Sequence, residues 1–288
     1  MSDLDQVLGF TIAARHARGR VVRLGPVLEN ILAAHGYPPV IERLLAEALV
    51  LTAMLGSTLK NAEGQMTLQA QTADGVVSLL VCDYQGGALR GYVKHDPERL
   101  AALPQAPTLD DLFNKGYLAI TFDQATSGER YQGIVPLEGQ SLAEAAESYF
   151  SQSEQIPSLV RIDMTGDIAG GILLQHLPEG EDGRDRIHTR LDHPEWDQVT
   201  ILGQTIKGTE LTDPDLALDR IVWRLFNEEE VRVFEPIALS KGCRCNPDHV
   251  RDVILKFPEA DRAEMADEKG IIAVDCAFCA KIFSIKAP

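Results

Sequence analysis

Cysteine is the residue type whose spacing points most directly to chemistry in this chain. Of the five cysteines in 288 residues, four are arranged as Cys243-x-Cys245 and Cys276-x-x-Cys279, with 30 residues between the two pairs. Four thiolates suit a tetrahedral Zn²⁺ ion with no open coordination position, which is typical of structural rather than hydrolytic zinc sites. The spacing therefore predicts a Zn²⁺ site with Cys243, Cys245, Cys276 and Cys279 as its ligands.

The one-residue spacer between Cys243 and Cys245 also favours redox chemistry. Ordinary zinc knuckles have two or more spacer residues, because the chain must wrap around the ion, whereas this spacer leaves the two sulfurs close enough to oxidise together. Arg244, Lys241 and Lys281 add positive charge nearby in the sequence, which favours thiolate over thiol. The same cations stabilise a four-thiolate metal site, so the pattern fits both a permanent zinc clip and a redox-active centre.

Two further residues are candidates for this chemistry, and both are expected to lie outside it. His249 is expected on the surface of a helix rather than as a fifth ligand. Cys82 ends the apolar run VVSLLVC and is expected to be a small buried hydrophobic residue. The chain has no phosphate-binding glycine loop, no Gly-x-Ser-x-Gly and no His-Glu-x-x-His motif, so no catalytic residue is predicted and an enzyme is not expected.

The elements that must position the cysteines form a small C-terminal zinc-binding domain, residues 236–288. Asn246-Pro247 predicts the start of a short helix, and IIAVDC and KIFSI predict two strands joined by a turn at Cys276–Cys279. So small a unit buries too little apolar surface to be stable alone. Structural zinc supplies about 10–16 kcal/mol to small domains, against about 5–15 kcal/mol for the net stability of a whole domain. Loss of metal is therefore expected to unfold this domain.

Residues 1–178 predict a mixed α/β body with antiparallel sheets, and the whole chain is assigned to the α+β class. Apolar runs punctuated by Asp74-Gly75 and Gly86-Gly87 predict hairpins, and an earlier pair of strands is expected around a turn at 17–19. The segment 38–59 predicts a long helix that is apolar on almost all sides and therefore buried.

Residues 179–235 predict a charged helical linker between the body and the zinc-binding domain. They contain 7 basic and 15 acidic residues, which is half of the net charge of −16 of the whole chain. The segment DLALDRIVWRLFNEE predicts a helix capped at Asp213-Pro214, with apolar residues on one stripe: Leu218, Ile221, Val222, Leu225 and Phe226. The linker is either a solvated connector or a metastable segment that is ordered only by docking this stripe.

The acidic balance limits the partners that the chain is expected to bind. A net charge of −16 repels nucleic acid and anionic membrane, and no apolar run reaches the ~18–20 residues of a membrane-spanning helix. The first residues, MSDLDQVLGF, lack the features of a signal peptide, so a soluble cytoplasmic protein is expected. In a reducing compartment, clustered cysteines are more often metal ligands or redox groups than structural disulfides.

Two alternatives remain for the cysteine pairs. A zinc-ribbon protein that binds nucleic acid requires a basic face, whereas residues 236–288 carry 8 basic and 8 acidic residues. A thiol–disulfide oxidoreductase usually has its Cys-x-x-Cys between a strand and a helix, where the helix dipole lowers the pKa of the first thiol. Here strands are predicted on both sides of Cys276–Cys279.

Several segments in the same order carry a resemblance to a known family. They are RGYV, GERYQGIVPLEGQSLAEAAESYFSQSEQIPS, AGGILLQHLP, RLFNEEEVRVFEP and the two cysteine pairs. With these segments the chain closely resembles, over essentially its whole length, the redox-regulated 33 kDa chaperonin (heat-shock protein 33) family of bacterial holdases. YFSQSEQIP and the cysteine spacing are the most specific parts, and Asn246 stands where family members often have serine.

The resemblance implies an ATP-independent chaperone that is inactive and monomeric while reduced and zinc-bound. Oxidation would join Cys243 to Cys245 and Cys276 to Cys279 as disulfides and release zinc. The zinc-binding domain and the metastable linker would then unfold, and the body would bind unfolding client proteins and form a homodimer. Refolding would fall to ATP-dependent foldase chaperones downstream.

Overall fold

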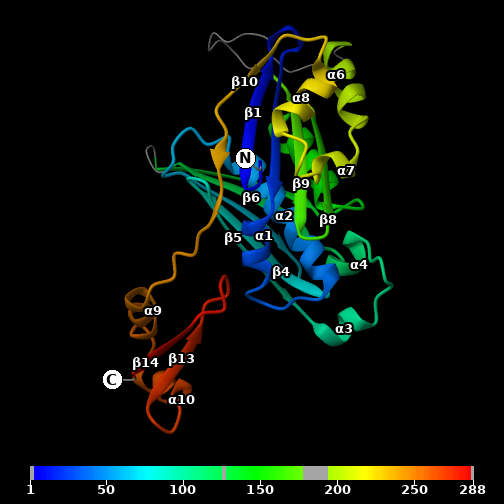
Figure 1. Cartoon of the computed structure of the whole chain (residues 1–288). Coiled ribbons are helices and arrows are strands. Elements are labelled where there is room, and N and C mark those ends of the chain that lie inside the picture. The colour runs from blue at the N-terminus through cyan, green and yellow to red at the C-terminus, as the bar shows by residue number, and fades with distance from the viewer. Residues whose placement is uncertain (1–2, 125–127, 178–193, 287–288) are drawn as a thin grey trace.

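The protein is described here by a computed structural model that covers residues 3–124, 128–177 and 194–286 (Figure 1). Within these residues, two six-stranded sheets enclose a long central helix, and a separate two-stranded hairpin lies with two short helices near the C-terminus. Below, residues 3–124 and 128–177 are called the body, and residues 243–286 the cysteine module. Sheets that are antiparallel apart from one short pair, mixed with helices, confirm the predicted α+β class.

The first sheet has the strand order β10-β1-β2-β9-β8, and β11 also pairs with β1. The segments from the far end of the chain thus lie beside the first strand of the protein. The strands are β1 (Gln6–Ile12), β2 (Ala17–Leu24), β8 (Ser158–Thr165), β9 (Ile168–His176), β10 (Val231–Val233) and β11 (Ile237–Ala238).

The turn between β1 and β2 precedes the predicted position at 17–19. A short 3₁₀ turn, Ala13–Arg15, is closed by His16 in the left-handed region, with φ 45°. Gly19 lies within β2, where an added Cβ would be 2.1 Å from the ring of Phe10. The glycine is therefore required by close packing between two strands, and not by a turn.

The second sheet has the strand order β12-β5-β4-β3-β6-β7. Its turns include the two predicted glycine turns, and Gly86 and Gly87 both have positive φ. The strands are β3 (Gln65–Gln71), β4 (Val77–Gln85), β5 (Ala88–His95), β6 (Tyr117–Gln124), β7 (Glu129–Pro136) and β12 (Ser240–Lys241).

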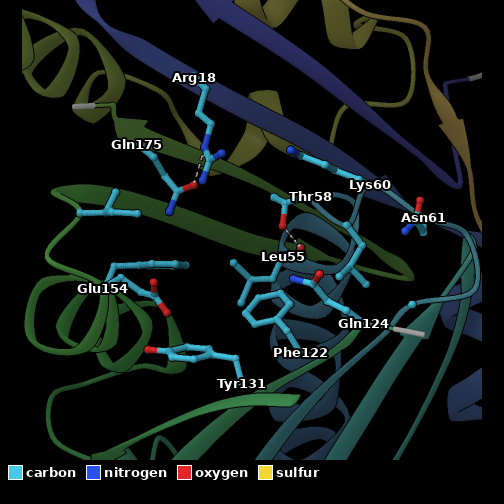
Figure 2. A pocket seen from close by; sticks show the side chains of 14 residues that line it. Arg18, Leu55, Thr58, Lys60, Asn61, Phe122, Gln124, Tyr131, Glu154 and Gln175 are labelled. Carbon is cyan, nitrogen blue, oxygen red and sulfur yellow. Dashed lines mark hydrogen bonds between the residues drawn. The ribbon is translucent and has the colours of Figure 1, made fainter. Parts of the chain in front are cut away.

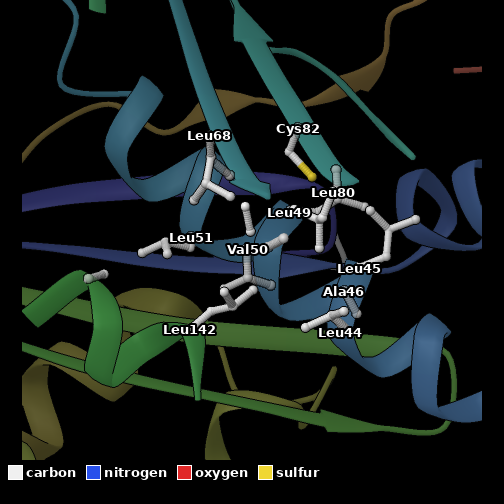
Figure 3. Close-up of a cluster of buried hydrophobic side chains, with 14 of the residues drawn as sticks. Leu44, Leu45, Ala46, Leu49, Val50, Leu51, Leu68, Leu80, Cys82 and Leu142 are labelled. Carbon is white, nitrogen blue, oxygen red and sulfur yellow. The ribbon is translucent and has the colours of Figure 1, made fainter. Parts of the chain in front are cut away.

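Helix α2 (Pro39–Gly56) contacts strands of both sheets, which explains its almost uniformly apolar sequence. In Figure 3, side chains of α2 lie against Leu68, Leu80 and Cys82 of the second sheet and Leu142 of α5. Each fully buried aliphatic side chain contributes about 1.5–3 kcal/mol. The prediction of a buried helix is confirmed, and this core keeps the body together.

The opposite face of the first sheet is covered by helices that follow residue 193. They are α6 (Pro194–Gln204), α7 (Gly208–Leu211) and α8 (Leu218–Phe226), and the predicted apolar stripe of α8 is buried against the sheet. The helix starts at Leu218 rather than directly after Pro214, because Asp213 Oδ1 accepts a hydrogen bond from the Asp215 N–H in a local turn (2.9 Å). The charge-dense start of the predicted linker, 179–193, lies outside the described residues.

The remaining helices of the body are short. A π-helical turn, Phe150–Glu154, continues α5. No helix in the part of the chain that the structure describes is long and apolar enough to cross a membrane. The helices are α1 (Pro26–Leu32), α3 (Pro97–Ala101), α4 (Leu109–Phe113) and α5 (Leu142–Tyr149).

Candidate metal centre

Cys243 and Cys245 lie in a short connection between β12 and helix α9 (Pro247–Ile254). The backbone N–H of Gly242 donates to Leu89 O of the body (2.8 Å), which fixes the start of this connection. Its end is fixed by Asn246, whose side-chain oxygen caps α9 by accepting from the N–H groups at positions 248 and 249. The two cysteines are thus held between two anchored points.

Cys276 and Cys279 lie in the turn between strands β13 (Ile271–Asp275) and β14 (Ile282–Lys286), as predicted. The Cys276 N–H donates to Lys281 O (3.0 Å), and Cys276 O accepts from the N–H groups of Cys279 (3.2 Å) and Ala280 (2.8 Å). Ala280 has φ 54°, which lets the chain turn back into β14. This tight turn brings both thiols of the second pair to one end of the hairpin.

All four sulfur atoms converge, and they lie within 4.8 Å of one another. The Sγ–Sγ distances are 3.2 Å for Cys243 and Cys245, and 3.5 Å both for Cys243 with Cys276 and for Cys245 with Cys279. Zn–S bonds of about 2.3 Å place the corners of a tetrahedron about 3.8 Å apart. The donor set therefore fits a tetrahedral metal ion closely.

The electrostatics of the cluster favour a bound cation. Burial raises the pKa of Cys245 most, and hydrogen bonds with the neighbouring cysteines and the charge of Cys243 raise it further. A divalent cation at the centre reverses this effect and holds the thiols deprotonated. The four cysteines can therefore hold a metal ion.

The apolar core of the cysteine module is small, as the sequence predicts. Its buried members are Ile254 of α9, Ile272 of β13, and Phe283 and Ile285 of β14. Helix α10 (Glu259–Met265) contributes no buried residue. Four buried side chains supply about 6–12 kcal/mol, less than the entropy cost of ordering more than forty residues. The module needs a covalent or metal link to be stable.

The two other candidates lie where the sequence predicts. His249 is exposed on α9, and Cys82 is fully buried in the core of the body, where burial raises the pKa of its thiol. Among the described residues, no other group of three or more His, Cys, Asp or Glu side chains converges as a metal site.

The residue between the first two cysteines, Arg244, reaches the body. Its Nη1 donates to Gln65 Oε1 (2.7 Å), and its Nη2 lies 3.7 Å from Asp83 Oδ2. Lys241 likewise donates to the backbone oxygen of Asn30 (2.6 Å). The sequence suggests these cations as neighbours of the thiols; in the structure their charged groups bind the body instead.

Phe278, one of the two residues between Cys276 and Cys279, also contacts the body. Its ring lies 4.0 Å below the guanidinium of Arg90 and 4.9 Å from the ring of Tyr92, edge to face. His35 Nε2 lies 3.3 Å from Phe278 O and donates to it when that nitrogen carries the proton. Burial lowers the pKa of His35, which favours the neutral ring.

Asp83 connects these two contacts. It is a buried carboxylate on β4 that accepts from Arg90 Nε (2.7 Å) and from the Thr67 hydroxyl (2.7 Å), beside Arg244. Both cysteine loops therefore contact the Asp83–Arg90 pair of the second sheet: the first loop through Arg244 and the second through Phe278. Polar residues at alternate positions of QMTLQAQ indicate that this sheet face is not core, but the sequence does not indicate what covers it.

A cavity of about 390 Å³ also lies in the body, at one end of the two sheets (Figure 2). Arg18 donates to Gln175 at its rim (3.0 Å), while Phe122 and Tyr131 form part of its apolar wall. None of the predicted site residues lines this cavity, so the candidate site is the cysteine centre.

Comparison with known proteins agrees with this geometry. A family model described as Hsp33 protein matches residues 5–286. The 33 kDa chaperonin of Caulobacter vibrioides (strain NA1000 / CB15N) is 39% identical over 296 residues, covering 99% of this chain and 95% of that protein. The 33 kDa chaperonin of Yersinia pestis (strain Pestoides F) is 36% identical over 285 residues, covering 97% and 91%.

A solved structure has the same fold. The crystal structure of the 33 kDa chaperonin (heat shock protein 33 homolog) from Thermotoga maritima superposes with a TM-score of 0.81 at 21% identity, covering 98% of this chain and 95% of that chain. The family match over nearly the whole length and the sequence identity of its relatives lead to one conclusion: this chain belongs to the Hsp33 family of 33 kDa chaperonins.

Proposed function

We propose that the protein is a redox-regulated, ATP-independent holdase whose switch is the cysteine centre. In the reduced, inactive and monomeric form, Cys243, Cys245, Cys276 and Cys279 hold Zn²⁺, which links two chain segments that are distant in sequence. The observation that carries the proposal is the convergence of these four sulfurs beside a core of four buried side chains. A module with so small a core depends on that link for its fold.

Oxidation of the cysteines removes the link. A thiolate attacks the O–O bond of hydrogen peroxide, giving a sulfenic acid and hydroxide; the second thiolate then displaces hydroxide and forms the disulfide. Formation of each disulfide consumes one molecule of hydrogen peroxide, which takes two electrons from the pair of thiolates and is reduced to two hydroxide ions. The pairs are Cys243–Cys245, whose sulfurs are 3.2 Å apart, and Cys276–Cys279 within the second turn. Disulfide sulfurs are poor metal ligands, so Zn²⁺ is released.

Unfolding of the cysteine module then detaches it from the body. Arg244 and Phe278 lose the geometry in which they contact Asp83 and Arg90, and the linker loses a docked neighbour. We propose the units 1–178 as client-binding and dimerisation body, 179–235 as metastable linker, and 236–288 as redox switch. Apolar surface uncovered in this way binds unfolding client proteins.

The active form is expected to be a homodimer that holds clients until ATP-dependent foldase chaperones refold them. A cytoplasmic location is proposed, since a reducing compartment keeps the switch off until oxidative stress. With a net charge of −16, no binding of nucleic acid or membrane is expected.

Enzymatic thiol–disulfide exchange is a weaker alternative. Cys276 lies in a turn between two strands rather than at the start of a helix, so no helix dipole lowers the pKa of its thiol. A switch that acts once per oxidation cycle needs no such activation.

The test follows zinc release and holdase activity together in the purified full-length chain. Peroxide at a mildly elevated temperature is expected to release one Zn²⁺ per chain and, in parallel, to suppress aggregation of a heat-unfolded test protein. Cys82→Ala is the matched control and is expected to respond as the wild type, since this thiol is fully buried. Zinc retained in peroxide, or release without any gain of holdase activity, would contradict the proposal.

A further inference from the structure

One segment of the chain covers one edge of each sheet, at β1 and at β5. Residues 231–241, called the edge segment, pair antiparallel with β1 through β10 and β11, and parallel with β5 through β12. In Figure 1 the segment runs along β1 and then down to the cysteine module. Its end is only two residues from Cys243, so the pairing of β12 with β5 attaches both the edge segment and the cysteine module to the body.

The edge segment is held on β1 mainly by its backbone. The Phe234 N–H donates to Gly9 O (2.8 Å), and the Leu239 N–H donates to Asp5 O (2.7 Å). The side chains of Val233, Phe234 and Ile237 remain 43%, 40% and 38% exposed, although they are apolar. Within the segment only Leu239 is buried. Such a strand contributes main-chain pairing and little apolar burial, so it is easily exchanged.

The strand beneath it is firmly fixed. β1 pairs with β2 along its whole length, and Leu8, Phe10 and Ile12 are buried in the cluster below α8. Release of the edge segment therefore leaves an ordered strand with a row of free N–H and C=O groups. Such an edge is a template for any extended polypeptide.

We infer that the outer edge of β1 is a binding site for an extended stretch of client polypeptide, which adds as an antiparallel strand in place of residues 231–239. The inference rests on the proposed function, because release of the cysteine module frees the edge. The edge segment itself, VRVFEPIAL, shows the chemistry of the occupant: extended and rich in apolar residues. Main-chain recognition accepts many sequences, as a chaperone for diverse unfolding proteins requires.

The test uses a labelled peptide of residues 229–241 with the oxidised and the reduced full-length chain. Fluorescence anisotropy is expected to show binding to the oxidised chain and at least tenfold weaker binding to the reduced chain, whose edge is filled. The unlabelled peptide is expected to displace a heat-unfolded client and so to restore its aggregation.

Two methylated peptides isolate the main-chain contacts. Methylation of the amide nitrogens of Phe234 and Leu239 removes the two N–H groups that donate to β1. Methylation at Val233 and Ala238 removes N–H groups that point away from β1, because N–H direction alternates along an antiparallel strand. The first peptide is expected to bind about tenfold or more weakly than the second, since each lost hydrogen bond is worth roughly a factor of five.

Each other outcome overturns a defined part of the reasoning. Equal binding of the two methylated peptides would exclude strand addition. An oxidised chain that suppresses aggregation without binding the peptide would overturn the inference and leave the proposed function intact. An oxidised chain with no holdase activity would overturn the proposed function itself. Hydrogen exchange of the Thr11 amide can also be measured without client. If its protection rises with protein concentration, the edge binds a second copy of this chain instead of a client.

Discussion

Replacing Arg23 with methionine is expected to detach the connection between α7 and α8 from the body. Arg23 is fully buried on β2, and its guanidinium donates to Leu216 O (2.7 Å) in that connection and to two backbone oxygens at the end of α7, Leu211 O (2.8 Å) and Glu210 O (3.2 Å). Methionine fills much of the same space but donates no hydrogen bond. The substitution therefore leaves buried carbonyl groups unpaired without opening a large cavity.

The magnitude follows from these contacts. Hydrogen bonds from a charged donor are worth about 1.5–3 kcal/mol each, so three of them amount to roughly 5–9 kcal/mol. Removing the buried charge recovers part of this sum, because its desolvation cost also disappears. We expect a net loss of about 3–5 kcal/mol in the docking of residues 208–218, which corresponds to a hundredfold or greater rise in the opening equilibrium.

Hydrogen exchange of the reduced, zinc-loaded protein measures this equilibrium directly. Backbone amides from Thr212 to Phe226 are expected to exchange at least a hundredfold faster in Arg23→Met, while those of α2 remain unchanged. Arg20→Met is the control, since the Nη1 of Arg20 donates to its neighbour Gly19 O on the same strand. Protection within about threefold of the wild type in Arg23→Met would refute the reasoning, because it would mean that the apolar stripe of α8 alone holds the linker.

Three further perturbations test other parts of the molecule. Cys243→Ser should reduce bound zinc below one ion per chain and unfold the cysteine module, which is measured as a loss of amide protection. The control Cys82→Ala should retain as much zinc as the wild type. One full zinc ion per chain in Cys243→Ser would refute the four-ligand site. Phe278→Ala should retain zinc but weaken docking of the module by about 1–3 kcal/mol, through loss of the contacts with Arg90 and the edge-to-face ring; unchanged small-angle scattering and exchange at the interface would argue against this. Burial raises the pKa of Glu47 from 4.5 to about 7, so the folded chain binds the proton more tightly than the unfolded chain. The stability that this proton adds is complete below pH 4.5 and is lost as the pH rises through 7; Glu47→Gln should therefore unfold at a urea midpoint that varies less across this range, and equal pH profiles would contradict the shift.

The sequence predicts the parts of the structure that depend on local pattern. The cysteine spacing predicts that the four thiols form one cluster, and their sulfur atoms do lie within 4.8 Å of one another. The uniformly apolar run of α2 predicts its burial, and the stripe of α8 predicts which face is docked. In each case the residues that carry the signal are neighbours in sequence or on one helix face.

Long-range polar contacts cannot be predicted from the sequence in the same way. Nothing around Arg23 in RVVRLG indicates that its side chain meets backbone oxygens about 190 positions later. Asp83 and Arg90 read as ordinary residues of a hairpin, and their role beside Arg244 depends on where the second sheet meets the cysteine module. The sequence of β1, too, gives no sign that β10 and β11 pair with its two ends, since main-chain pairing leaves no side-chain pattern.

The single-residue spacer in Cys243-Arg244-Cys245 has a consequence for any attempt to transplant this centre. Successive side chains of an extended chain point to opposite sides, so two sulfurs turned toward the metal turn the residue between them away from it, and here toward Gln65. One inserted residue would leave four thiols but rotate the arginine off its partner. Grafted onto another scaffold, residues 243–279 would carry the four thiols and Arg244, but they would leave behind Gln65, the residue of the body to which Arg244 donates.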